Sequence, residues 1–226
     1  MPGLIPLLIF VITLTFFSGA YFISSTFYQK KFNVNYSLKR MFPYEVNYPT
    51  TFKNNVYGNV AFIISLAGTV AFYIYYLVTR EVITVPVYAT MALSAFMAIF
   101  VGFLFFMPLK YLRFHMIVST LAMVSAFSIP ALNAIVVYTS MHMDPNNQGV
   151  YITAMIIGGL MSLAMLILLL NPNATYKIYM EKEKDAEGNE KVVRPKFIPM
   201  AFSEWWAIIT FVVSPISLLF ISFLGQ

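Results

Sequence analysis

Two ionisable residues, His115 and Glu204, stand where apolar segments begin, so they are the first candidates for chemistry at a membrane surface. Ionisable groups near a membrane core suggest a functional site. A histidine and a carboxylate could relay protons, act as acid and base, or bind a lipid headgroup. The structural alternatives are a simple hydrogen bond and, for Glu204, stabilisation by a helix N-terminus beside Trp205. We therefore assign no catalytic residue, and His115 and Glu204 are the candidates if the protein is an enzyme.

The composition offers few residues that could bind a metal or a cofactor. The chain has no cysteine and only two histidines, His115 and His142, so disulfides, thiolate sites and an all-histidine cage are not expected. His142 lies between Met141 and Met143, and a soft-ligand copper site there is the minority interpretation. No P-loop, H-E-x-x-H or G-x-S-x-G motif occurs. We expect no metal and no cofactor.

The composition is that of a membrane protein. Of the 226 residues, 60% are hydrophobic and only 10% charged, and the mean hydropathy is +0.77. A soluble domain is about half apolar and about a quarter charged. Lipid must cover the excess apolar surface. The sequence therefore predicts an all-α polytopic membrane helix bundle that forms a single integral membrane domain over residues 1–226.

Six segments have the roughly 20 apolar residues that a spanning helix needs. They cover residues 4–23, 58–79, 82–107, 112–140, 150–170 and 202–223. Tight turns are expected at Arg80–Glu81 and at Pro108–Lys110. The fourth segment is longer than the bilayer requires and contains Pro130, so we expect it to tilt, to kink, or to extend beyond the membrane.

The basic residues predict the orientation of these spans. The first loop holds five of the 14 basic residues, the third two and the fifth six, whereas Arg80 alone lies in an even-numbered loop. Cytoplasmic loops carry the excess of Lys and Arg. Both termini are therefore expected outside the cytoplasm, and a bacterial plasma membrane is the simplest location. This topological pattern also explains the net charge of +5 without a nucleic-acid partner.

Two of the basic loops have further features. The first, residues 24–57, is rich in aromatic residues and is expected to lie in the interface or to fold back on the bundle; a surface for a lipid or a partner is the alternative. The fifth alternates charged residues on both sides of a turn at 185–189, which predicts a cytoplasmic β-hairpin. The residues predicted to bind lipid or a partner are Lys39, Arg40, Tyr44, Arg113, His115, Glu204 and Trp205.

Four residues are better explained by helix packing. Pro130 frees a backbone carbonyl that needs a partner. Asn133, one turn later, is expected to form a hydrogen bond across the bundle. Gly158 and Ser162 are four residues apart and give one helix a face of small residues that permits close contact.

Three short features resemble the six-span Frag1/DRAM/Sfk1 group and its bacterial relatives of unknown function. An aromatic first loop leads into the second span through Asn55-Val56-Tyr57-Gly58-Asn59, the third loop leads to His115, and the last span opens with Glu204-Trp205. The resemblance implies lipid handling, lipid organisation or membrane trafficking. In that group the first loop is expected outside the cytosol, whereas the charges of this chain place it inside.

These observations favour a non-enzymatic membrane protein that binds lipid or assembles with partners. Two alternatives remain. An accessory subunit of a transport, secretion or respiratory complex would need an exposed face of small residues, such as that of Gly158 and Ser162, to be covered by another protein; a homo-oligomer is also possible. A membrane enzyme acting on lipid headgroups would need His115 and Glu204 to converge in a cavity.

Overall fold

The computed structural model describes residues 3–47, 55–79, 84–107, 111–142, 145–174, 181–184 and 190–223. Its helices and strands are α1 (Leu4–Phe32), η1 (Pro43–Asn47), α2 (Val56–Thr79), α3 (Val85–Phe106), α4 (Leu112–Met141), η4 (Pro145–Asn147), α5 (Gln148–Leu169), β1 (Glu181–Lys184), β2 (Glu190–Val193), α6 (Pro199–Val213) and α7 (Ile216–Ser222). Within this described part, six helices are long and apolar enough to cross a membrane, with α6 and α7 together forming the sixth. The prediction of an integral membrane helix bundle is confirmed at this level.

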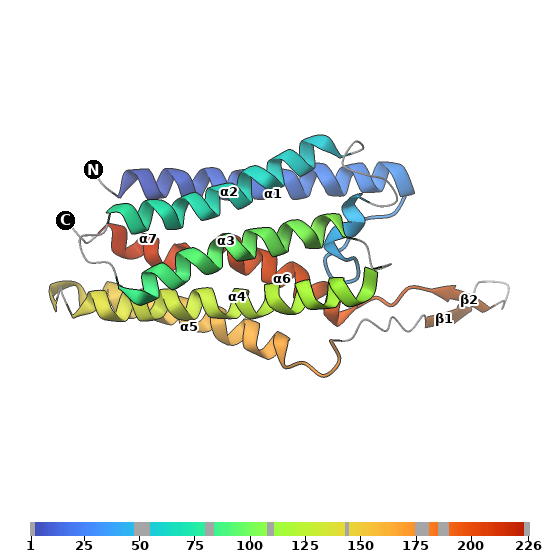
Figure 1. Ribbon diagram of the computed structural model, residues 1–226. Helices are drawn as coiled ribbons and strands as arrows, with labels where there is room; N and C mark the ends of the chain where they lie inside the picture. Colours follow the sequence, from blue (N-terminus) through green and yellow to red (C-terminus); the bar gives the residue numbers. More distant parts are fainter. Residues whose placement is uncertain are drawn as a thin grey trace.

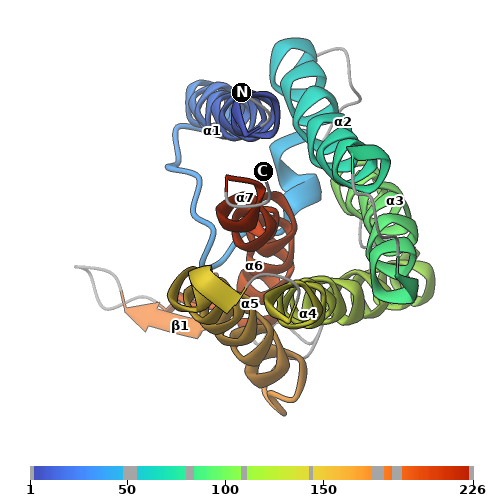
Figure 2. The ribbon, with the colours of Figure 1, turned by 90° about the vertical axis from the view of Figure 1, so that its left-hand side faces the viewer.

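The last span occupies the centre of the bundle. Viewed along the helices from the end that carries the termini, α1 to α5 surround α6 and α7 (Figure 2). Accordingly α6 is buried on most of its surface, with Trp205, Ile208 and Phe211 among its fully buried side chains. The outer helices expose apolar side chains over much of their length, as lipid-facing helices do. A polar side chain on the central helix must therefore find its partner inside the protein.

Both termini lie at one end of the bundle, and the first loop, the start of α4 and the hairpin lie at the other (Figure 1). We call the latter the basic end, because α1 finishes there with Lys30 and Lys31. Strands β1 and β2 pair antiparallel, with Glu181 opposite Val193. The predicted turns at Arg80–Glu81, Pro108–Lys110 and 185–189 lie outside the described residues, as do Lys53 and Met143 of the predicted loops.

Two of the predicted spans differ from the observed helices, whereas the fourth has the excess length that was predicted for it. Helix α1 continues past its apolar part to Phe32, since Lys30 and Lys31 favour a helix C-terminus. Helix α4 runs without interruption through Pro130, and its 30 residues span about 45 Å, longer than the hydrocarbon core of about 30 Å. The last span, predicted as one helix over residues 202–223, is interrupted at Ser214 and Pro215, because Pro215 has no N–H to continue the helical ladder.

Candidate functional site

His115 and Glu204 meet at the basic end of the bundle. His115 is in the first turn of α4 and Glu204 is in the second turn of α6, and 3.0 Å separates Nε2 of the histidine from Oε1 of the carboxylate. The other ring nitrogen, Nδ1, lies 2.9 Å from the carbonyl of Met107, which caps α3. The imidazole therefore joins three helices at one point.

The two hydrogen bonds of His115 define where its protons lie. The Met107 carbonyl can only accept, so Nδ1 carries a proton and donates it. Nε2 and Glu204 then share one more proton, as imidazolium with carboxylate or as neutral imidazole with carboxylic acid, because two lone pairs would repel each other at 3.0 Å. The pair is electrically neutral in both arrangements, which lowers the free-energy cost of burying it in the bundle.

Aromatic side chains from the first loop cover this pair. The rings of Phe42 and Tyr44 pack edge-on against the imidazole, at 6.3 and 5.9 Å between ring centroids. The side chains of His115 and Glu204 are both 0% exposed. A lipid headgroup cannot reach either group in this arrangement, so the geometry is that of a sealed structural pair and not of an open acid–base site.

The segment that carries Phe42 is itself fixed to the central helix. The indole N–H of Trp205 donates to the carbonyl of Met41 at 3.0 Å and to the Tyr36 hydroxyl at 3.2 Å. Tyr36 in turn donates to the carbonyl of Phe42 at 2.7 Å. Burial, reinforced by the negative charge of Glu45, raises the pKa of the Tyr36 phenol well above its usual value. Tyr36 thus remains a hydrogen-bond donor throughout the physiological range.

A second ion pair links the first loop to the segment that follows β2. Arg194 donates through its two terminal nitrogens to the two carboxylate oxygens of Glu45, at 2.7 and 3.0 Å. Glu45 also accepts the backbone N–H of Phe42 at 2.7 Å. Close by, the N–H of Ile198 donates to the carbonyl of Lys39 at 2.8 Å. Bidentate geometry and partial burial make the Arg194–Glu45 pair the stronger kind of surface ion pair.

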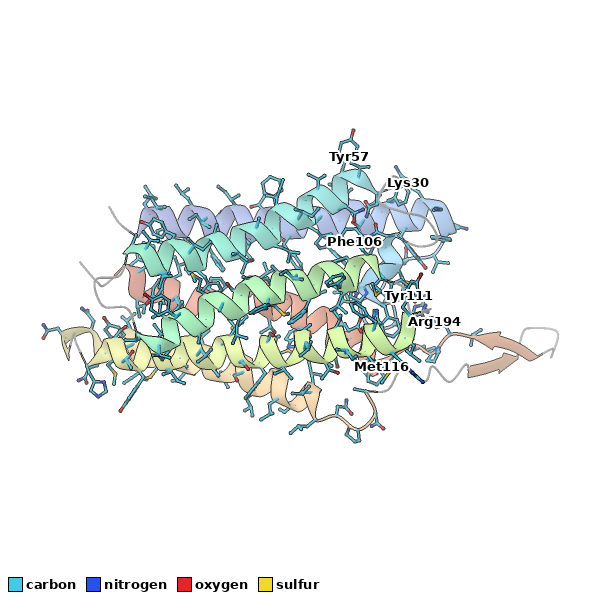
Figure 3. All side chains as sticks on the ribbon, in the orientation of Figure 1. Lys30, Tyr57, Phe106, Tyr111, Met116 and Arg194 are labelled. Atoms are coloured by element: carbon cyan, nitrogen blue, oxygen red, sulfur yellow. The ribbon has the colours of Figure 1, made fainter. Side chains whose placement is uncertain are left out.

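Beside this ion pair lies a cavity of about 380 Å³. It opens between the end of α1, the first loop and the segment after β2, and Figure 3 places Arg194 at this basic end together with Lys30 and Tyr111. Three cations line the cavity: Arg40, Arg194 and Lys196. Its remaining walls include the ring of Tyr28 and the apolar side chains of Met41 and Val193.

The predicted binding residues lie in different surroundings, and only one of them lines the cavity. Arg40 lines the cavity, whereas Lys39 and Arg113 are exposed and do not. Tyr44 packs on His115. His115, Glu204 and Trp205 are buried, and the structure does not present them to lipid or to a partner.

The sequence did not identify Arg194 and Lys196 as binding residues. They served there only to predict the orientation of the spans. Glu45, an acidic residue within a basic loop, was the one available signal, but the sequence does not say which of the basic residues pairs with it.

Asn133 forms the predicted cross-bundle contact, at the interruption of the last span. Its amide donates to the Tyr73 hydroxyl at 3.0 Å and to the Ser214 carbonyl at 2.9 Å. The Ser214 hydroxyl donates to the carbonyl of Phe211, which Pro215 leaves without its helical donor. Tyr73 must then donate to Ser214, 2.8 Å away. This directional chain satisfies the polar groups that the helix break exposes.

Gly158 and Ser162 pack on α4 at Pro130. A Cβ added to Gly158 would lie 2.9 Å from the carbonyl of Pro130, so only glycine permits this approach. The Ser162 hydroxyl donates to the carbonyl of Phe127 at 3.0 Å, within the turn that Pro130 loosens. The small-residue face is therefore used inside the chain.

In the part of the chain that the structure describes, no group of three or more His, Cys, Asp or Glu side chains could hold a metal ion. No protein-family model, curated protein or solved structure matches this chain.

Proposed function

We propose that the protein is a non-enzymatic integral membrane protein that binds the headgroup of an anionic lipid at its basic end. The observation that carries this proposal is the cavity with Arg40, Arg194 and Lys196 in its walls. Cations clustered where a membrane protein meets the headgroups attract anionic lipids, by about 1 kcal/mol for each Lys or Arg. The resemblance to the Frag1/DRAM/Sfk1 group agrees with a role in lipid handling.

The position of the cavity relative to the membrane supports a lipid as its occupant. Tyr28 lies five residues beyond the apolar stretch of α1 that ends at Ile23. A helix rises by about 1.5 Å per residue, so Tyr28 stands roughly 7.5 Å outside the hydrocarbon boundary, at headgroup level. The excess of Lys and Arg in the loops at this end supports a cytoplasmic position for it under the positive-inside rule. A bacterial plasma membrane, whose inner leaflet contains anionic lipids, is the proposed location.

Two observations make the alternative functions weaker. An acid–base enzyme would need access to His115 and Glu204, whose side chains are fully covered. The face of Gly158 and Ser162, which an accessory subunit could have offered to another protein, is occupied by α4 of the same chain. Lipid binding is left as the function that uses an accessible site.

The test is native mass spectrometry of the protein released from detergent that contains equal amounts of phosphatidylglycerol and phosphatidylcholine. The wild type should retain phosphatidylglycerol in preference. The double variant Arg40→Gln/Lys196→Gln should weaken this retention by roughly 30-fold, since it removes two contributions of about 1 kcal/mol. Lys39→Gln/Arg113→Gln removes the same residue types and the same charge outside the cavity, and should leave retention near the wild-type level.

Two outcomes would contradict the proposal. Equal losses in the two double variants would show that net charge, and not the cavity, attracts the lipid. A wild-type protein that carries a stoichiometric protein chain and no lipid would replace lipid binding with the role of an accessory subunit.

A further inference from the structure

The charges around the cavity are not equally available to a ligand. Arg194 is neutralised by Glu45, which holds both of its terminal nitrogens at 2.7 and 3.0 Å. Arg40 and Lys196 form no ion pair among the described residues. The cavity therefore presents two uncompensated positive charges on opposite chain segments, the first loop and the segment after β2.

Among the described residues no carboxylate lines the cavity, and Glu45 beside it is already paired with Arg194. Lys and Arg side chains can only donate hydrogen bonds. A choline, ethanolamine or serine headgroup would bring a positively charged nitrogen among Arg40, Arg194 and Lys196, and like charges repel each other. The fitting ligand is therefore rich in acceptor oxygens and carries no ammonium.

We propose that the cavity selects a lipid whose headgroup is a phosphate monoester over lipids whose phosphate is a diester. This inference rests on the proposed function and names the class of headgroup. A phosphate monoester has a charge of about −1.5 to −2 at neutral pH and three acceptor oxygens, whereas a diester carries one negative charge. Among lipids with a single phosphate, only the monoester supplies enough negative charge to balance both Arg40 and Lys196 without drawing Arg194 away from Glu45.

The lipid-borne form of the monoester is the occupant that we propose, because the cavity lies beside the end of α1 at headgroup depth. The apolar side chains of Met41 and Val193 in its wall give the glycerol and ester region a surface that a free phosphate would not use.

The experiment is a competition between phosphatidic acid and phosphatidylglycerol, offered in equal amounts to the purified full-length protein and read by native mass spectrometry. At about pH 7.5 phosphatidic acid should be retained about fivefold over phosphatidylglycerol, the effect of one additional charge near the surface. At about pH 5 the dianionic monoester takes up one proton and carries about one negative charge, as the diester does, so the preference should disappear. Arg40→Gln should remove the preference at the higher pH, whereas Arg113→Gln, on the exposed start of α4, should preserve it.

The outcomes separate this inference from the proposed function. Equal retention of both lipids, each above phosphatidylcholine, would overturn the monoester selectivity and leave anionic lipid binding intact. A preference that persists unchanged at about pH 5 would overturn it too, since headgroup size and not charge would then be the cause. Retention of neither lipid would overturn the proposed function itself. Displacement of phosphatidic acid by soluble glycerol phosphate would show that the site takes a free phosphate ester, contrary to the lipid-borne occupant.

Discussion

The basic end of the bundle contains a sealed polar pair and an open basic cavity, built from neighbouring parts of the first loop. The pair of His115 and Glu204 has the residue types of an acid–base site, yet its side chains are fully buried under Phe42 and Tyr44. The cavity has only ordinary loop cations, yet Arg40 and Lys196 remain unpaired by the described residues and border accessible space. Thus the side chains that could act as acid and base are buried, whereas the side chains that border accessible space are cations.

The separation has a physical cause. A charge inside the bundle must be neutralised and hydrogen-bonded, and a histidine that joins α3, α4 and α6 achieves both. At headgroup level a cation costs little, since water and lipid phosphates solvate it. The sealed pair should therefore determine stability, and the cavity should determine binding. The following changes test that division.

The largest effect is expected from Glu204→Ala. It leaves Nε2 of His115 buried without its partner and opens space in the centre of the bundle. Breaking a buried pair in this way costs about 3 to 5 kcal/mol. The free energy of unfolding, measured by titration with sodium dodecyl sulfate in mixed micelles, should fall by this amount, while retention of anionic lipid by the folded fraction should not change.

Glu204→Gln is the matched control. Its amide can donate to Nε2 of a neutral His115, so the loss should be limited to about 1 kcal/mol. If this variant folds and also abolishes lipid retention, the two regions are not separate and the comparison fails.

The next effect is expected where α5 approaches α4. Gly158→Ala places a Cβ 2.9 Å from the backbone carbonyl of Pro130, which cannot move aside without shifting the helix. Such overpacking costs about 1 to 3 kcal/mol. At the adjacent Gly159 no atom lies within 4 Å of the added Cβ, so Gly159→Ala should leave thermal stability unchanged or raise it slightly. Equal destabilisation by both substitutions would disprove the close contact.

A smaller effect is expected at the interruption of the last span. Tyr73→Phe removes the hydroxyl that links Asn133 to Ser214. Hydrogen bonds between membrane helices contribute about 0.6 kcal/mol on average, so the loss of two should cost roughly 1 kcal/mol. Tyr88→Phe, on an exposed position of α3, is the control and should have no effect. Unfolding in the same micelles would measure both.

The smallest effect is a dependence of stability on high pH. Because burial raises the pKa of Tyr36 in the folded protein, its stabilising contribution is complete below the unfolded value of about 10 and is lost as the pH rises toward the folded value. The wild type should lose stability more steeply than Tyr36→Phe as the pH is raised above about 10. Identical slopes in an unfolding series over this range would show that Tyr36 is not sealed.

The apolar segments predicted the six spans, because length and hydropathy are local properties of the sequence. The interruption at Pro215 was missed, although the proline was visible, since the surrounding residues are as apolar as an unbroken span. That His115 and Glu204 lie at the same end followed from the alternating loops.

The burial of this pair did not follow from the sequence. It depends on the path of the first loop, which brings Phe42 and Tyr44 over the imidazole, and no helical periodicity encodes that path. The cavity could not be predicted for the same reason. Its cations come from segments about 150 positions apart, as Glu45 and Arg194 do. Arg40 was predicted as a binding residue, whereas Arg194 and Lys196 were found only when both loops had been placed.

The central claim is that the cavity bordered by Arg40, Arg194 and Lys196 holds an anionic headgroup. The most direct measurement is an experimental structure of the protein in nanodiscs that contain phosphatidic acid and phosphatidylglycerol. We expect phosphate density in the cavity, within hydrogen-bond distance of Arg40 and Lys196, with the Glu45–Arg194 pair intact beside it. An empty cavity in a protein otherwise surrounded by ordered lipid would contradict this claim.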